Sequence, residues 1–375
     1  MTTMLRISAS IARLQPYEPG WQAGNSDETA GLGRASIYLA SNENALGCSP
    51  AAMRAIESHQ AVNRYPRSGL QIRHKLAEVL SLSVRNVVVG NGSDSIIGNV
   101  IRTFAEKEDE VLTGDSTYPS FSVQAKVHGM LVRTVPYKNW FIDLGAIAGA
   151  IRPATKIIYL PNPNNPSGTM FTNDEFREFH AQVPDSVLVI LDQAYYEYAL
   201  EQPGYPRLPY LDYENVITLR TFSKAYGLAG LRLGYGIACQ AIIDQLLKTQ
   251  LPFETNSLAE AAAVAALDDQ EFIGTTVSTN RRNRAVTVEE LREIGFTVIP
   301  SATNFVMVVF ASAAESNLIA TELLKRGIVV RLLSSFGLPQ CIRITIGTKE
   351  EMKTCMRKMT VLHSTLEEFG CITKD

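Results

Sequence analysis

Lys224 and Arg232 lie eight residues apart in a segment, residues 221–235, that is rich in hydroxyl-bearing, small and glycine residues. A lysine that loses solvent at the end of a strand can deprotonate and attack a carbonyl carbon to give a Schiff base. An arginine beside it can bind a phosphate through two parallel hydrogen bonds. The pair therefore favours a phosphorylated aldehyde cofactor, with pyridoxal phosphate as the candidate. A surface loop with two ordinary cations is the alternative that this segment alone leaves open.

Apolar runs that predict β-strands recur at wide spacing along the first two thirds of the chain. They are residues 86–89, 110–112, 131–135, 156–160, 187–191 and 216–219. Most of these runs are continuously apolar, and several connections between them are long enough for a helix. The pattern predicts an α/β fold with a mostly parallel sheet covered by helices on both faces. In such sheets, ligands bind beyond the carboxyl ends of the strands.

Residues whose side chains could bind a ligand or take part in a reaction follow four of these predicted strands. Tyr118 follows the second strand, Asn165 the fourth, Asp192 and Tyr195 the fifth, and Lys224 the sixth. Each residue has an ordinary explanation, as part of a turn or as a helix cap. Their joint occurrence at the ends of strands of one sheet instead predicts a shared site.

A glycine turn follows the first predicted strand and precedes a predicted helix. Its residues are Gly90, Asn91, Gly92, Ser93 and Asp94. A helix that begins there would present free backbone N–H groups to an anion. The alternative is a tight turn in which serine or aspartate caps the helix. The segment matches neither the dinucleotide-binding fingerprint nor the P-loop.

The pattern changes beyond residue 275, where predicted strands at 304–310, 328–332 and 341–346 alternate with helices. Capping boxes are predicted at Ser312 and at Thr348. Arg331 and Arg343 lie inside two of the strands, where a charge is costly unless it is paired. We expect an anionic ligand there, with salt bridges to carboxylates as the alternative. The predicted division is an N-terminal arm that also joins the small domain (1–40), a large cofactor-binding domain (41–274) and a small α+β domain (275–375).

Composition excludes several classes of protein. The chain has 375 residues, 46% of them hydrophobic, and a net charge of -3, so it offers no basic field for nucleic acid. No apolar run approaches the ~18 residues that span a bilayer, and the N-terminus lacks a secretory apolar region. The five cysteines are scattered, which predicts reduced thiols and a cytoplasmic location. The five histidines show no metal-ligand spacing, so no metal is expected.

These residues resemble the fold-type I, class II pyridoxal-phosphate aminotransferases, most closely the histidinol-phosphate aminotransferase family. The resemblance covers nearly the whole chain. Its most specific segments are residues 41–44, 64–66, 90–94, 164–168, 223–232 and 335–348. It implies a homodimeric transferase of histidine biosynthesis that uses pyridoxal 5'-phosphate and moves an amino group from L-histidinol phosphate to 2-oxoglutarate by a ping-pong mechanism.

The resemblance also implies the role of each matching residue. Lys224 would hold the cofactor covalently and move the reacting proton, and Asp192 would pair with the pyridine nitrogen. Tyr118 would stack on the ring, while Asn165 and Tyr195 would hydrogen-bond to its phenolic oxygen. The cofactor phosphate would be held by Gly92, Ser93, Asp94, Thr221, Ser223 and Arg232.

Further implied contacts concern the partner subunit and the substrate. Tyr65 would reach the cofactor phosphate of a neighbouring subunit, so that two copies share each active site. Arg343 would bind the carboxylate of glutamate or 2-oxoglutarate. Arg331 and Tyr17 would surround the phosphate of histidinol phosphate.

Four features depart from the family pattern: Gln193 instead of glutamate, Ala45 instead of proline, Phe336 instead of tyrosine, and an atypical segment 21–35. They keep open an aminotransferase for aromatic or other biosynthetic amino acids. Two further alternatives do not depend on these departures. One is a pyridoxal-phosphate-dependent decarboxylase of a phospho-amino acid, which would resemble this chain in fold and cofactor site, and the other is a non-catalytic binding protein.

Overall fold

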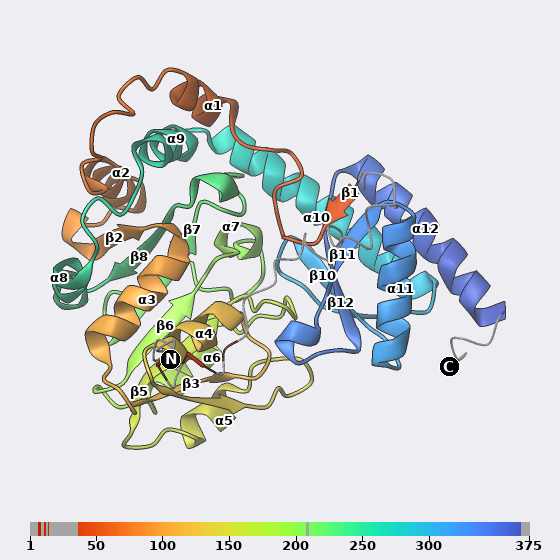
Figure 1. The fold of residues 1–375 in the computed structure, drawn as a ribbon, viewed down its shortest axis with the longest axis horizontal. Coiled ribbons are helices and arrows are strands. Elements are labelled where there is room, and N and C mark those ends of the chain that lie inside the picture. Colours follow the sequence, from red (N-terminus) through yellow and green to blue (C-terminus); the bar gives the residue numbers. More distant parts are fainter. Residues whose placement is uncertain (1–6, 9–10, 13, 15–36, 208–209, 369–375) are drawn as a thin grey trace, which may run out of the picture.

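The structure, a computed structural model, describes residues 7–8, 11–12, 14, 37–207 and 210–368. These residues form two β-sheets with helices packed against them (Figure 1). The larger sheet comprises, in spatial order, β2 (Val87–Gly90), β8 (Gly234–Ala238), β7 (Val216–Thr221), β6 (Leu188–Asp192), β5 (Thr155–Pro161), β3 (Glu110–Gly114) and β4 (Leu131–Val135). The smaller sheet comprises β1 (Ile37–Leu39), β11 (Ile328–Leu332), β12 (Cys341–Thr345), β10 (Phe305–Val309) and β9 (Thr297–Ile299).

The larger sheet has the predicted parallel character, with one exception. Strands β4, β3, β5, β6 and β7 pair in parallel, whereas β8 is antiparallel to both β7 and β2. Strand β8 was not predicted, because its sequence, Gly-Tyr-Gly-Ile-Ala, contains residues of low strand propensity. It forms because two neighbouring strands supply its hydrogen bonds.

Helices surround the two sheets. They are α1 (Pro50–Glu57), α2 (Leu70–Leu80), α3 (Gly92–Phe104), α4 (Pro119–Val127), α5 (Leu144–Gly149), α6 (Asn173–His180), α7 (Tyr196–Ala199), α8 (Gln240–Thr249), α9 (Ser257–Asp268), α10 (Gln270–Glu293), α11 (Ala313–Lys325) and α12 (Lys349–Glu368).

Both faces of the larger sheet are buried, which explains the continuously apolar strands. On β5, Ile157 and Tyr159 pack with residues of α3, α4 and α8, whereas Ile158 and Leu160 pack with residues of α5 and α6. Successive side chains of a strand point to opposite faces, so a strand covered on both sides must be apolar throughout. The predicted α/β class with helices on both faces is confirmed.

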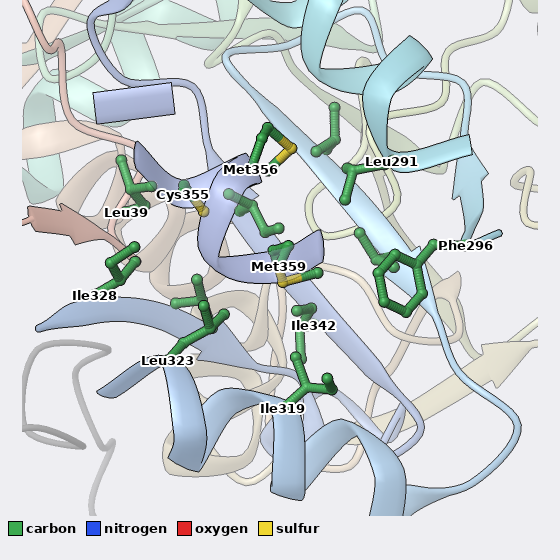
Figure 2. Packing of buried hydrophobic residues seen from close by; sticks show 14 of the residues in the cluster. Leu39, Leu291, Phe296, Ile319, Leu323, Ile328, Ile342, Cys355, Met356 and Met359 are labelled. Atoms are coloured by element: carbon green, nitrogen blue, oxygen red, sulfur yellow. The ribbon is translucent and has the colours of Figure 1, made fainter. Parts of the chain in front are cut away.

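The smaller sheet packs against α11 and α12. Figure 2 shows Met356 and Met359 of α12 and Ile319 and Leu323 of α11 meeting around Ile342 of the sheet. Helix α10 begins at Gln270, so the predicted domain boundary at residue 274 falls inside a helix. The division into domains therefore stays a prediction.

The two predicted capping boxes have different outcomes. At Thr348 both bonds form: Glu351 N–H donates to Thr348 Oγ1 at 3.3 Å, and Thr348 N–H donates to Glu351 Oε2 at 2.7 Å. At Ser312 only one bond has the predicted partner, because the carboxylate of Glu315 accepts from Ala311 N–H instead. Each arrangement still satisfies donors at a helix start.

The turn after Lys224 depends on Gly227. Its φ is +70°, and a Cβ atom there would lie 1.9 Å from the carbonyl oxygen of Gly47. Because that contact is with backbone, the segment at Gly47 and the lysine turn can pack this closely only if residue 227 is glycine.

We predict that Gly227→Ala lowers the free energy of unfolding by at least about 2 kcal/mol, since the left-handed backbone and the clash both oppose a side chain. Gly230→Ala is the matched control, because a Cβ there meets no described atom within 4 Å. Its effect should stay within about 0.5 kcal/mol in chemical denaturation. Equal losses in both variants would contradict this account of the turn.

Candidate active site

The structure brings most of the predicted site residues to one cavity at the carboxyl ends of β5, β6 and β7. Lining it are Ser93, Asp94, Tyr118, Asn165, Asp192, Tyr195, Thr221, Ser223, Lys224 and Arg232. Parallel strands end at the same edge of a sheet, so segments distant in sequence meet there. Lys224 and Asp192 thus face the same cavity. Their chemical roles remain predictions.

Lys224 lies in the turn that follows β7, and its Nζ donates to the carbonyl oxygen of Ser41 at 3.2 Å. Desolvation is the largest cause that lowers the pKa of Lys224, to about 8, and the nearby positive charge of Arg343 acts in the same direction. About one amine in ten is then uncharged at pH 7, against fewer than about one in a thousand for an ordinary lysine. This environment suits a nucleophilic amine.

Asp192 is the last residue of β6, and its carboxylate is buried. Burial raises the pKa of Asp192 to about 6, while two hydrogen bonds oppose that rise. Tyr159 Oη donates to Oδ2 at 2.7 Å, and the backbone N–H of Ala194 donates to Oδ1 at 3.0 Å. These donors favour the anion, so the site can present a negative charge near neutral pH.

Tyr195 is held by contacts to the smaller sheet and to the segment that follows β1. Its Oη accepts a hydrogen bond from Asn42 Nδ2 at 2.8 Å, and its ring packs edge-on against Phe305 at 5.2 Å. Asn42 N–H in turn donates to Thr345 Oγ1 at 3.0 Å. One wall of the cavity is therefore fixed by residues far away in sequence.

The opposite end of the cavity can hold an anion. Helix α3 begins at Gly92, and the side chain of its N-cap residue, Asn91, makes no capping hydrogen bond to the described residues. The serine or aspartate cap considered above therefore does not form, and Ser93 and Asp94 line the cavity. Arg232 Nη1 donates to Ser223 Oγ at 3.4 Å. A helix start beside a guanidinium and a hydroxyl suits a phosphate.

Gly92 lies behind this anion-binding end. Its φ is +77°, and a Cβ there would lie 2.7 Å from Arg232 Nη2. Arg232 also lies 3.5 Å from Asp94 Oδ2. Asp94 therefore faces the guanidinium and orients it, while glycine leaves room for that side chain.

Arg331 and Arg343 occupy opposed positions on β11 and β12, and both are buried. Arg343 donates to Asn165 Oδ1 and to the carbonyl oxygen of Ala40, the second bond at 2.8 Å. Arg331 donates to Ser335 Oγ at 3.2 Å. Asn165, which belongs to the larger sheet's loops, lines the cavity, so its bond with Arg343 places that arginine behind a residue of the cavity lining.

Five predicted site residues are not among the described residues that line this cavity: Gly92, Arg331, Arg343, Tyr65 and Tyr17. Tyr65 is 80% exposed and stacks on Phe253 with ring centroids 4.5 Å apart. Tyr17 lies outside the described residues.

Tyr159 and Asn42 contact site residues but were not predicted to belong to the site. Tyr159 lies inside a continuous apolar strand, where nothing in the sequence distinguishes its hydroxyl from a packing group. Asn42 lies in residues 41–44, one of the segments that carry the resemblance to the family. That segment was the available signal for Asn42.

None of the helices formed by the described residues is long and apolar enough to cross a membrane.

Comparisons with known proteins agree on one family. Residues 34–359 match the profile of aminotransferase class I and II. The histidinol-phosphate aminotransferase of Geobacillus sp. (strain WCH70) is 37% identical over 361 residues, 95% of this chain and 98% of the relative. That of Bacillus subtilis (strain 168) is 39% identical over 351 residues, 92% and 97% of the two chains.

A solved structure gives the same result in three dimensions. The crystal structure of histidinol-phosphate aminotransferase from Sinorhizobium meliloti, in complex with pyridoxal-5'-phosphate, has a TM-score of 0.87 and 28% sequence identity. The alignment covers 97% of this chain and 99% of that one. The chain therefore belongs to the class I and II aminotransferases, in the histidinol-phosphate aminotransferase family.

Proposed function

We propose that the protein is a pyridoxal-phosphate-dependent aminotransferase that takes the amino group of L-histidinol phosphate and passes it to 2-oxoglutarate. The observation that carries this proposal is that Lys224 and Asp192 line one cavity. An amine with a lowered pKa and a buried carboxylate are the two groups that such a cofactor requires.

The residues of the cavity fit pyridoxal phosphate. Arg232, Ser223 and the start of α3, whose N-cap side chain makes no capping hydrogen bond to the described residues, offer donors for the phosphate. Asp192 would hold the ring nitrogen. Bound pyridoxal phosphate supplies an aldehyde that captures amines and a ring that withdraws electrons from the bond to be broken.

The chain's own residues supply the proton chemistry and the orientation. Lys224 Nζ, when uncharged, would hold the cofactor as a nucleophile and would take and return the proton of the substrate's α-carbon. Asp192 stays anionic because Tyr159 and Ala194 donate to it. Asn42 orients Tyr195, whose hydroxyl would donate to an oxygen inside the cavity.

The two buried arginines would bind the anionic groups of the substrates. Arg343 would bind the carboxylate of 2-oxoglutarate, and Arg331 would bind the phosphate of the amino donor. Both substrates carry anionic groups, two carboxylates in 2-oxoglutarate and a phosphate in L-histidinol phosphate, so neighbouring cations suit both half-reactions. The names and identities of the relatives support this donor.

The proposed assembly is a homodimer in the cytoplasm. Tyr65 and Phe253 form an exposed aromatic pair, and Val62 and Leu251 are also exposed. Such a patch suits a second copy of the chain, to whose cofactor Tyr65 would contribute.

In the described part of the chain, Cys48, Cys239, Cys341 and Cys355 are free thiols, as expected in a reducing compartment.

Lys224→Ala should eliminate covalent capture of the cofactor. After borohydride reduction, the wild-type polypeptide should gain the cofactor's mass, and the variant should not. Capture by the wild-type apoprotein should accelerate as pH rises and level off above about pH 8, because the uncharged fraction of Lys224 saturates there.

Lys248→Ala is the matched control for this experiment, since Lys248 is an exposed lysine that bonds to Gln245. It should behave like the wild type. A gain of cofactor mass by Lys224→Ala would remove this residue from the proposed mechanism.

Asp192→Ala and Tyr159→Phe should form a graded pair. The first should retain some cofactor but lose most turnover. The second keeps the ring, which stacks on Phe121 at 4.4 Å, and removes one hydrogen bond worth about 1.5–3 kcal/mol, so kcat should fall about 10- to 100-fold.

The pH profile separates these two variants from general damage. Loss of the Tyr159 donor raises the pKa of Asp192, so the acid limb of the kcat profile should move to higher pH. Near-normal turnover of Asp192→Ala, or an unmoved acid limb in Tyr159→Phe, would contradict the role assigned to the carboxylate.

Arg331→Ala should distinguish donors by their phosphate. With 2-oxoglutarate as acceptor, kcat/KM for L-histidinol phosphate should fall about 10- to 100-fold, as expected for one lost charge-assisted hydrogen bond, and kcat/KM for phosphate-free L-histidinol should change much less. Arg326→Ala, at an exposed arginine paired with Glu322, is the control. Equal losses for both donors would point to another substrate, which a panel of amines scored by 2-oxoglutarate consumption would identify.

A further inference from the structure

The hairpin at residues 138–141 has an unusual backbone. Lys138 and Phe141 exchange two backbone hydrogen bonds, of 2.9 and 3.0 Å, around Asn139 and Trp140. Both central residues have positive φ, +51° and +71°. Asparagine tolerates this region, but a tryptophan there is strained, so other contacts must hold it.

The Trp140 side chain packs into the smaller sheet, although its hairpin follows β4 of the larger one. It lies against a buried cluster that includes Met307, Leu333, Phe336 and Leu338. Trp140 thus joins the two sheets by apolar packing, and this burial offsets the strain of its backbone.

Phe336, one member of the cluster against which Trp140 packs, also lies near the two buried arginines. Its ring centroid is 6.0 Å from Cζ of Arg331 and 5.8 Å from Cζ of Arg343. An aromatic face at this distance attracts guanidinium groups and limits where they can lie. A shift of the Phe336 ring would therefore change where the guanidinium groups of Arg331 and Arg343 can lie.

A second connection runs through hydrogen bonds from the same hairpin. Thr169 Oγ1 donates to the carbonyl oxygen of Trp140 at 3.0 Å and lies 2.7 Å from Ser167 Oγ. Ser167 Oγ also accepts from Asn164 Nδ2 at 2.9 Å. The next residue, Asn165, accepts a hydrogen bond from Arg343.

We propose that Trp140 is a positioning residue for the anion-binding arginines: by fixing Phe336 and the loop at 164–169, it sets how Arg331 and Arg343 receive the anionic ends of the substrates. This inference rests on the proposed function, in which those arginines bind phosphate and carboxylate. The described residues that line the cofactor cavity include Asn165 of this loop but not Trp140, so cofactor binding should depend on Trp140 less than anion binding does.

The test compares Trp140→Ala, Trp140→Phe and Asn139→Gly as holoenzymes. The ligand is glutarate, a dicarboxylate that cannot accept an amino group, titrated through the visible absorption of the bound cofactor. Trp140→Ala should weaken glutarate binding about tenfold and raise KM for 2-oxoglutarate similarly. The change in kcat should be less than about threefold, because the variant keeps both arginine charges and leaves Lys224 in place.

The other two variants separate the ring from the backbone. Trp140→Phe should restore glutarate binding to within about threefold of the wild type, since an aromatic ring again packs on the cluster. Asn139→Gly relaxes the turn at an exposed residue and should leave binding unchanged. The dissociation constant of the cofactor should change less than that of glutarate in Trp140→Ala and stay near the wild-type value in the other two.

A Trp140→Ala enzyme that is less stable but binds glutarate like the wild type would overturn the proposal, because the residue would then only pack. If that variant does not fold, Trp140→Leu is measured against the same criterion. Arg343→Ala is titrated in parallel. Unchanged glutarate binding in Arg343→Ala would instead overturn the proposed substrate site, so the two failures are distinguishable.

Discussion

Removal of water from one amine and one carboxylate within a single cavity is the constraint on which the rest of this structure depends. Desolvation lowers the pKa of Lys224 to about 8 and raises that of Asp192 to about 6, so it favours the uncharged form of each. The amine needs that shift to act as a nucleophile. The carboxylate must stay ionised in spite of that shift. The hydrogen bonds that Tyr159 and the N–H of Ala194 donate to Asp192 favour its ionised form.

The larger sheet makes this enclosure possible, and the smaller sheet completes it. Asp192 and Leu219 are paired on adjacent parallel strands, so the turn with Lys224 begins beside the carboxylate. Strand β1 pairs with β11 of the smaller sheet and leads directly into Ser41, which accepts the hydrogen bond from Lys224. Arg343 then connects β12 to Asn165 of the larger sheet's loops. Each sheet alone would leave the amine open to solvent.

The sequence allowed the strand-end residues to be predicted because their position follows from local rules. A buried parallel strand is a continuous apolar run, and whatever follows it lies at the ligand-binding edge. This reasoning was sufficient for Tyr118, Asn165, Asp192 and Lys224, all of which line the cavity.

Residues whose role depends on tertiary partners could not be found in this way. Tyr159 resembles any other apolar strand residue until β6 is placed beside it, and β8 becomes a strand only between its neighbours. The carboxylate of Glu315 likewise has a nearby donor, Ala311 N–H, that spacing alone did not indicate.

Gln193 shows how a departure from the family pattern can serve the same electrostatic requirement. Its Oε1 accepts a hydrogen bond of 3.0 Å from Nε of the buried Arg220, whose guanidinium lies 3.3 Å from the centroid of the Tyr196 ring. An amide oxygen can accept this bond as a carboxylate would.

A second buried anion directly after Asp192 would raise the pKa of that carboxyl further and oppose its ionisation. Glu197 already supplies an acidic partner for Arg220. Burial raises the pKa of Glu197 to about 7, and the charge of Arg220 opposes that rise. Glutamine at position 193 therefore keeps the hydrogen bond between β7 and the residue that follows β6, and it adds no charge beside Asp192.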